Sequence, residues 1–407
     1  MDEVSVLRDK LKQKYKRVSK VPIDCNNISE FKLLQHQSML TDIIKSRKQL
    51  PQRGLLLYHG IGSGKTLSSI ISIEELLNSS EYTKAIVLTP ASLQTNYVTE
   101  LQKYNSALRS KIKIFAYNTV QVITKIRKEN LDNTVIVVDE CHNLMSMIAN
   151  NSKIGSELYN IFLNPKKNMY FLFLSATPII NTVYEIGLLF NILRPGLFFN
   201  NVYFRKDQFI DRYKRLSQNL EINAEFQIKI YGLTSYFPGV RDREVYPRYK
   251  FQVVLCQMSE AHMQKYRQIE TTENRINQNM KNDSNLYRIY TRQACNFAII
   301  DPKKIKYQMF ITQNLKENSS KMYKLLRNIK ESQGKLLIYS NFKEIGISLV
   351  QKILDFHKIS YVLWTGTEKV AIKEDNLQKF NDSSNISGDK IKCFLITSAG
   401  AEGISLK

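Results

Sequence analysis

The chain has 407 residues, of which 43% are hydrophobic, and carries a formal net charge of +22. This length and apolar content exclude a disordered protein and allow two domains with substantial cores. The positive charge indicates a polyanionic partner, with nucleic acid as the first candidate, although a coding bias towards lysine and asparagine also contributes to such an excess.

The five cysteines are odd in number and widely spaced, and no two form a Cys-x-x-Cys pair. We therefore expect neither disulfides nor a zinc site. Residues 1–30 are basic and polar and lack the apolar segment of a secretory signal, and no apolar run is long enough to cross a bilayer. These features predict a soluble intracellular protein without a membrane partner.

A helix begins near Phe31 and contains Gln37. The amide of a glutamine can donate and accept hydrogen bonds at once, which suits the edge of adenine. Gln37 is therefore a candidate nucleotide-binding residue, although a glutamine in a helix often has no such role.

The stretch 55–66 passes from an apolar strand through a glycine-rich loop into an apolar helix. Backbone N–H groups of such a loop, beside a helix N-terminus, form a cradle for phosphate. The candidate cradle residues are Gly60, Gly62, Ser63 and Gly64. We expect Lys65 to reach the terminal phosphates of ATP and Thr66 to hold Mg²⁺. The usual pattern has glycine five residues before Gly64, where this chain has His59.

Strands and helices alternate after this loop. Apolar runs at 85–88, 135–138 and 170–174, together with the segment 111–115 in which lysines alternate with apolar residues, predict parallel strands buried within the sheet. Each run ends in polar residues, and an open α/β sheet binds its ligand at the carboxyl ends of its strands. The pattern predicts a doubly wound nucleotide-binding lobe over residues 31–197.

The tetrad 139–142 follows one of these strands and contains two adjacent acids and a histidine. Attack of water on a γ-phosphate requires a carboxylate for the metal and a group that orients the water. We expect Asp139 to hold the metal through its water shell, Glu140 to orient the attacking water, and His142 to connect the nucleotide with the loop Ser175–Thr177. The alternative is an acidic turn without chemistry. Ser175 and Thr177 are candidate coupling residues.

Residues 198–318 have broken apolar periodicity and predict a partly helical connector or insertion. Alternation resumes at 335–339, 361–364 and 392–397, which predicts a second α/β lobe over 319–407. That lobe is expected to be incomplete, because the chain ends ten residues after its last strand. The loop that follows this strand contains Gly400 and Glu402, which either approach the nucleotide and a sugar–phosphate backbone or form a tight turn.

The order of these motifs resembles helicase superfamily 2, whose members pair two RecA-like lobes that hydrolyse ATP while they hold nucleic acid. The segments that carry the resemblance are Gln37, 62–66, 89–92, 139–142, 175–177 and 398–403. Within the superfamily, residues 89–101 and 175–195 resemble the chromatin-remodelling translocases. Residues 139–143, 191–196 and 232–236 resemble a viral group of that branch, the poxvirus nucleoside triphosphatase I proteins.

The resemblance implies a DNA-dependent ATPase that uses ATP and Mg²⁺ and assists a viral RNA polymerase in transcription termination and elongation, in the virion and host cytoplasm. It also implies catalytic roles for Lys65, Asp139, Glu140 and His142. Two alternatives stay open: the ATPase subunit of a viral early-transcription initiation factor, or a non-catalytic scaffold that tethers polymerase to DNA. The arginine-bearing motif that ends this family's second lobe is not reached, so we expect a fragment whose own hydrolysis depends on that motif.

Nucleic-acid contacts are expected at the loops that follow the strands, where backbone amides and hydroxyls hold phosphates without reading bases. The candidates are Pro90, Ser92, Asn118, Ser340, Asn341 and Ser398. A basic cluster with interleaved tyrosines over 241–250 is either a further nucleic-acid or polymerase surface or a solvated connector face.

Overall fold

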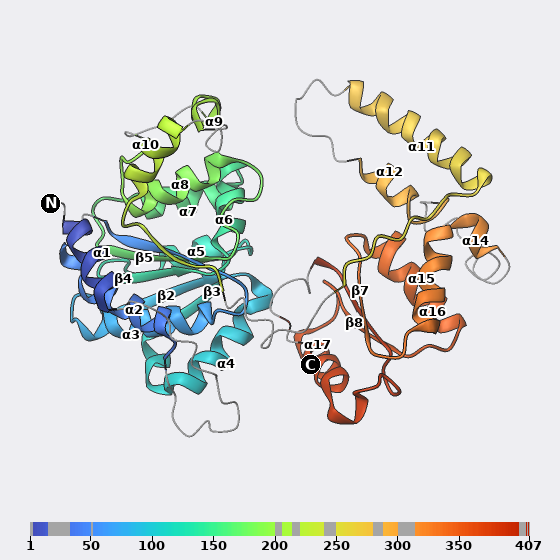
Figure 1. Cartoon of the computed structure of the whole chain (residues 1–407), viewed down its shortest axis with the longest axis horizontal. Helices are drawn as coiled ribbons and strands as arrows, with labels where there is room; N and C mark the ends of the chain where they lie inside the picture. Colours follow the sequence, from blue (N-terminus) through green and yellow to red (C-terminus); the bar gives the residue numbers. More distant parts are fainter. Residues whose placement is uncertain are drawn as a thin grey trace. The chain divides into compact units, whose positions relative to one another are not determined.

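The computed structural model describes residues 3–14, 33–49, 52–199, 206–213, 220–239, 250–279, 288–299 and 314–398, with 404 and 406. Its contacts divide the chain into two compact units, Met1–Arg248 and Tyr249–Lys407 (Figure 1). Each unit contains its own parallel sheet and its own hydrophobic core.

The first unit is built on a six-stranded sheet in the order β3-β2-β4-β5-β1-β6, and every pair of neighbouring strands is parallel. The strands are β1 (Gly54–His59), β2 (Lys84–Thr89), β3 (Ile112–Ala116), β4 (Thr134–Val138), β5 (Met169–Ser175) and β6 (Thr234–Phe237). The predicted α/β fold with a parallel sheet is confirmed.

Helices cover both faces of this sheet because its central strands are apolar on both sides. The helices of the unit are α1 (Glu3–Lys14), α2 (Gln35–Lys45), α3 (Lys65–Asn78), α4 (Gln94–Asn105), α5 (Val122–Arg127), α6 (Cys141–Ala149), α7 (Lys153–Phe162), α8 (Val183–Leu193), α9 (Lys206–Tyr213) and α10 (Leu220–Ile230). Short helical turns lie at η1 (Arg47–Gln49), η2 (Ala91–Leu93) and η3 (Ser106–Lys111).

Successive residues of a strand enter opposite cores, as the two-residue period of a strand requires. Val135 and Val137 of β4 pack with helices α2, α3 and α4, whereas Ile136 and Val138 pack with helices α5 to α10. Figure 1 shows these two groups of helices on opposite sides of the sheet. The sheet therefore lies between two apolar layers, and its polar chemistry is confined to the strand ends.

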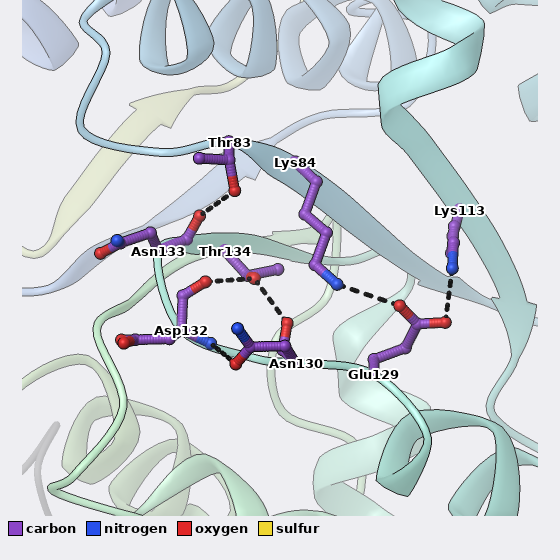
Figure 2. A network of polar contacts seen from close by, with 8 residues as sticks. All are labelled: Thr83, Lys84, Lys113, Glu129, Asn130, Asp132, Asn133 and Thr134. Atoms are coloured by element: carbon purple, nitrogen blue, oxygen red, sulfur yellow. Dashed lines mark hydrogen bonds and ion pairs between the residues drawn. The ribbon is translucent and has the colours of Figure 1, made fainter.

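A polar network fixes the amino ends of the strands (Figure 2). Glu129 accepts hydrogen bonds from Lys84 of β2 at 3.0 Å and from Lys113 of β3 at 2.7 Å. The Thr134 hydroxyl, at the start of β4, donates to the carbonyl groups of Asn130 and Asp132. The hydrogen bond from Lys113, with further help from Lys84, holds the pKa of the Glu129 carboxyl below its usual value. This network joins three strands at the edge of the sheet opposite to the phosphate loop.

The second unit contains a three-stranded parallel sheet in the order β7-β9-β8. Its strands are β7 (Leu336–Tyr339), β8 (Tyr361–Trp364) and β9 (Cys393–Ile396). Its helices are α11 (Glu260–Asn279), α12 (Ile289–Ala294), α14 (Leu315–Asn318), α15 (Ser320–Glu331), α16 (Ser348–Phe356) and α17 (Val370–Asn381), with turns η4 (Lys343–Ile347) and η5 (Ser383–Asn385). Cys393 and Leu395 of β9 face one core, and Phe394 and Ile396 face the other. The predicted second α/β lobe with its three strands is confirmed.

The segment predicted as a connector, 198–318, is divided between the two units. β6 adds to the free edge of β1, and Phe209 of α9 and Phe226 of α10 are buried in the first core. Helices α11 and α12 belong to the second unit. The sequence gives little sign of this division, because β6 has only four residues and is half-buried.

Within the residues that the structure describes, no helix has both the length and the apolar character required to cross a membrane. Of the described cysteines, Cys141, Cys256, Cys295 and Cys393 are free thiols.

Candidate nucleotide-binding and catalytic site

The predicted phosphate loop connects β1 to α3 and has the backbone of an anion cradle. Gly62 and Gly64 both have φ of 73°, in the left-handed region where a side chain is strained. Gly64 caps helix α3 directly, so that the first N–H groups of the helix are unpaired within it. The N-terminus of α3 therefore presents donors and the positive end of a helix dipole to an anion.

Glycine is required at position 60 because another chain segment approaches its backbone closely. The end of β6 lies against it: its N–H donates to the Phe237 carbonyl at 2.8 Å, and a Cβ on Gly60 would lie 2.5 Å from the Pro238 oxygen. Any side chain here would collide with the backbone of the segment that follows β6. The first glycine of the loop thus permits a close approach of two chain segments.

Three aromatic rings pack next to the phosphate loop. They belong to His36, His59 and Phe237 and are here called the histidine cluster. The His36 ring stacks on Phe237 with centroids 4.0 Å apart, and its Nε2 lies 2.9 Å from the carbonyl oxygen of Ser63. His59, where the usual loop pattern has glycine, is fully buried, and its Nε2 lies 3.0 Å from the Ser235 hydroxyl. Burial lowers the pKa of His59 to about 4, with smaller effects from His36 and Lys65, and burial also lowers the pKa of His36. Both rings are therefore neutral at neutral pH.

Lys65 and Thr66 occupy the first turn of α3 and are half-buried. The Lys65 ammonium lies 3.5 Å from the Gly60 carbonyl oxygen, so the side chain folds back over the loop. The buried hydroxyl of Ser63 has no hydrogen-bond partner among the described residues. An unpaired buried donor, an ammonium and a free helix N-terminus within one loop fit a triphosphate.

Gln37 lies against the phosphate loop and is only 2% exposed. Its Oε1 accepts the N–H of Leu34 at 2.9 Å, at the start of α2. Its Nε2 lies 3.0 Å from the position of a Cβ on Gly64. The side-chain oxygen of Gln37, which was predicted to bind adenine, thus already accepts a hydrogen bond at the start of a helix. Its second lone pair and the side-chain NH₂ group are the atoms that can bind a base.

The acid pair follows β4, and β5 separates β4 from β1 in the sheet. Neighbouring parallel strands are about 4.8 Å apart, so the ends of β4 and β1 are about 10 Å apart, which leaves room for a phosphate group. Asp139 is 6% exposed, and its Oδ2 lies 3.5 Å from the Thr89 hydroxyl at the end of β2. Lys65 and Asp139 therefore lie at the same edge of one sheet.

Glu140 has an unusual backbone and a defined neighbour. Its φ of 46° and ψ of 51° place a non-glycine residue in the left-handed region. Its N–H donates to Asp139 Oδ1 at 3.0 Å, and its Oε2 lies 3.3 Å from Nδ1 of His142. The two carboxyl groups are thus held in one compact turn from which they point to different partners.

His142 and the predicted coupling residues are in direct contact. Nδ1 of His142, a buried side chain, lies 2.9 Å from the Ser175 hydroxyl at the end of β5. The same hydroxyl oxygen accepts the N–H of Thr177 at 2.9 Å. Because β5 lies between β4 and β1, this contact joins the acid pair to the strand next to the phosphate loop.

The candidate nucleic-acid residues of the first unit also come together. Ala91 N–H donates to the side-chain oxygen of Asn118 at 3.2 Å, and Ser92 and Asn118 are exposed. Pro90 is buried and, as a proline, has no N–H to donate. Ser92 and Asn118, rather than Pro90, present polar groups at this surface.

In the second unit, Ser340 and Asn341 follow β7 and Ser398 follows the neighbouring strand β9. Asn341 and Ser398 are exposed, and Ser340 accepts the N–H of Phe342. Gly400 and Glu402 lie outside the described residues, as does the basic cluster over 241–250 apart from its exposed last residue, Lys250.

Five residues without an assigned role in the sequence analysis contact the predicted residues: His36, Thr89, Tyr117, Ser235 and Phe237. β6 has a weak signal: Thr234, Tyr236 and Phe237 favour a strand, and Pro238-Gly239 favours a turn after it, but four residues are few for such a pattern. The other residues reach the site through contacts between distant segments, which periodicity does not reveal.

Comparison with known proteins shows that the chain is related to helicase-like ATPases. The sequence model of the SNF2-related domain matches residues 36–112 and 108–308, so the chain belongs to the SNF2-related domain family. The prediction of helicase superfamily 2 and its chromatin-remodelling branch is confirmed.

Two viral proteins are similar to the chain over most of its length. A protein of Acanthamoeba polyphaga mimivirus that carries the name of an ATP-dependent RNA helicase is 28% identical over 93% of this chain and 74% of its own length. The termination factor NPH-I homolog of African swine fever virus (isolate Tick/South Africa/Pretoriuskop Pr4/1996) is 26% identical over 87% of this chain. The chain spans 63% of that relative's length. Among solved structures, the Sulfolobus solfataricus SWI2/SNF2 ATPase core in complex with double-stranded DNA has 18% identity and a TM-score of 0.42, over 90% of this chain and 78% of that one.

Proposed function

We propose that the protein is a Mg²⁺-dependent ATPase that moves along DNA during viral transcription. The observation that carries this proposal is the shared sheet edge: Lys65 and Thr66 begin the helix after β1, and Asp139 and Glu140 follow β4, one strand removed. Lysine, hydroxyl and paired carboxylates at this spacing are the groups that phosphoryl transfer to water requires.

Each residue has a distinct role in this proposal. The N–H groups around Gly64 and the Lys65 ammonium bind the β- and γ-phosphates. Thr66 would hold the metal with its hydroxyl, and Asp139 would hold it through the water shell. When bound, Mg²⁺ neutralises charge that develops on the phosphates. Glu140 orients the attacking water and accepts its proton. His142 keeps the direction of the Glu140 side chain fixed, because its Nδ1 lies near both Glu140 and Ser175.

Nucleic acid is the proposed activator. The net charge of +22 favours a polyanion, and Ser92 and Asn118 form an exposed polar patch beside the strand ends. Ser340, Asn341 and Ser398 form a comparable patch on the second unit. Contacts of this kind hold phosphates and carry no base sequence, as expected for a motor that passes over any sequence.

The transcriptional role rests on similarity to a termination factor homolog of another virus. We propose that the protein acts with a viral RNA polymerase at termination and elongation, in the virion and the host cytoplasm. An RNA substrate is the second candidate, because a relative of similar coverage carries the name of an RNA helicase. An initiation-factor subunit or a silent scaffold would give different results in the assay below.

The test measures ATP turnover by the full-length protein with no nucleic acid, with double-stranded DNA, with single-stranded DNA and with RNA. We expect stimulation by DNA and a loss of turnover of at least about 100-fold in Lys65→Ala, since this removes the charge that stabilises the phosphates. Lys103→Ala is the matched control, because Lys103 lies near the far end of α4, where its ammonium pairs with Glu100. Stimulation by RNA alone would favour the helicase alternative. Turnover without any stimulation, or none at all, would refute a DNA motor.

A further inference from the structure

Tyr117 connects the exposed nucleic-acid patch of the first unit with the acid pair. It follows β3, and its side chain is only 1% exposed. Its hydroxyl donates to the carbonyl oxygen of Glu140 at 3.1 Å. Because β2 lies between β3 and β4, this hydrogen bond connects the end of β3 with the turn after β4, which contains Asp139 and Glu140.

The Tyr117 hydroxyl acts at a strained point of the backbone. Glu140 is a non-glycine residue in the left-handed region, and such conformations persist only where the surroundings hold them. The Glu140 carbonyl also accepts the N–H of Asn143 in the first turn of α6. Tyr117 supplies the second donor to this oxygen, so it helps to set the direction in which the Glu140 side chain leaves the strand.

The other end of this connection is at the surface. The Tyr117 N–H donates to the Thr89 carbonyl at 3.2 Å, and the next residue, Asn118, accepts the N–H of Ala91 at 3.2 Å. Asn118 and Val120 are exposed, and Val120 is 86% exposed. The loop after β3 and the turn after β2 are therefore tied together by two hydrogen bonds, one residue away from a buried contact with Glu140.

We propose that Tyr117 is a positioning residue that couples nucleic-acid binding at Ser92 and Asn118 to the alignment of Glu140. This inference rests on the proposed function and adds the route by which nucleic acid stimulates turnover. A phosphate bound at the patch restrains the loop, the restrained loop holds the Tyr117 ring, and the hydroxyl holds the Glu140 carbonyl. A purely structural role would instead lie in the ring, which is part of the buried hydrophobic core of the first unit.

Tyr117→Phe separates these roles because it keeps the ring and removes only the hydroxyl. We expect the full-length variant to fold and to keep its KM for ATP and its affinity for DNA within about twofold. The ratio of DNA-stimulated to basal kcat should fall by about tenfold, which is the effect expected from the loss of one hydrogen bond that aligns a catalytic group. Tyr159→Phe is the matched control: its hydroxyl, on α7 in the same core, accepts a hydrogen bond from Asn191 at 3.2 Å. It should leave the ratio unchanged.

Asn118→Ala gives an independent test from the exposed end, where folding is not at risk. We expect it to lower the same ratio, and the double variant Asn118→Ala, Tyr117→Phe to lose no more than the larger single effect, as for two residues on one route. An unchanged ratio in Tyr117→Phe, an equal loss of basal and stimulated kcat, or additive losses in the double variant would overturn the coupling. If the parent protein shows no stimulation, the proposed function fails with it; if the parent is stimulated and these variants behave like the parent, only the coupling fails.

Discussion

Protonation of His59 should weaken the first unit as the pH falls. The ring is fully buried behind the phosphate loop, and its pKa of about 4 lies below the value of about 6.5 expected in an unfolded chain. A histidine with a lowered pKa stays neutral in the folded protein while the unfolded chain takes up a proton. Its stabilising contribution is therefore complete above about pH 6.5 and is lost as the pH falls towards about 4.

The size of this effect follows from the two pKa values. The full difference corresponds to about 3 kcal/mol, and between about pH 7.5 and about pH 5 the first unit should lose about 2 kcal/mol of unfolding free energy through His59 alone. His59→Gln cannot titrate in this range, and the pH-dependent difference between parent and variant isolates this histidine from the other ionisable groups.

Urea unfolding measured by far-ultraviolet circular dichroism at the two pH values provides the assay. The single tryptophan, Trp364, lies in β8 of the second unit, so its fluorescence reports that unit and serves as an internal control. We expect the parent to lose about 2 kcal/mol more than His59→Gln, with no difference in the tryptophan signal. Equal losses in both proteins would refute the claim that His59 is buried and neutral.

Three further changes have defined outcomes. Gly60→Ala places a Cβ 2.5 Å from the Pro238 oxygen, so it should lower the free energy of unfolding by about 1–3 kcal/mol and weaken ATP binding. Gly334→Ala is the control, because a Cβ there has nothing within 4 Å, and it should change neither quantity. Thermal melts and binding of a fluorescent ATP analogue measure the two effects, and equal behaviour of the two variants would contradict the close approach at Gly60. Glu129→Gln should lower the unfolding free energy by about 1 kcal/mol at pH 7, because the folded chain holds the pKa of the carboxyl below its usual value. The difference should shrink as the pH falls through that lowered pKa; a difference in urea melts that stays constant down to acid pH would contradict the pairing with the two lysines. Ser175→Ala removes the hydroxyl beside His142 and should lower kcat by about tenfold with little change in KM; a rise in KM alone would place this serine in ground-state binding.

Much of the fold was predictable because the buried strands are short continuous apolar runs. The run at 135–138 differs from β4 by one residue, and the run at 361–364 coincides with β8. A strand buried on both faces has no polar positions to confuse its limits, and polar residues must follow at its end. The same logic places the residues after β1 and β4, among them Lys65 and Asp139, at the carboxyl edge of one sheet.

The parts that were not predictable depend on contacts between distant segments. β6 pairs with β1 across about 180 residues, and the local sequence pattern at 234–237 does not indicate with which strand β6 pairs. His36 and Phe237 meet only because helix α2 and β6 both lie against the phosphate loop. Gly60 was expected only as a residue of the phosphate cradle, whereas the structure shows that it also admits the backbone of Pro238. The left-handed backbone of Glu140 is likewise set by its neighbours, since glutamate itself does not favour it.

The central claim is that triphosphate chemistry takes place where Lys65, Asp139 and Glu140 meet at the carboxyl edge of the first sheet. The most direct test compares ATP binding and ATP turnover in full-length Glu140→Gln, with Glu157→Gln as the control, because Glu157 pairs with Arg127 on the outer surface. We predict that Glu140→Gln binds ATP as tightly as the parent and loses turnover by at least about 100-fold, while the control keeps both. Undiminished turnover in Glu140→Gln would contradict this account of the site.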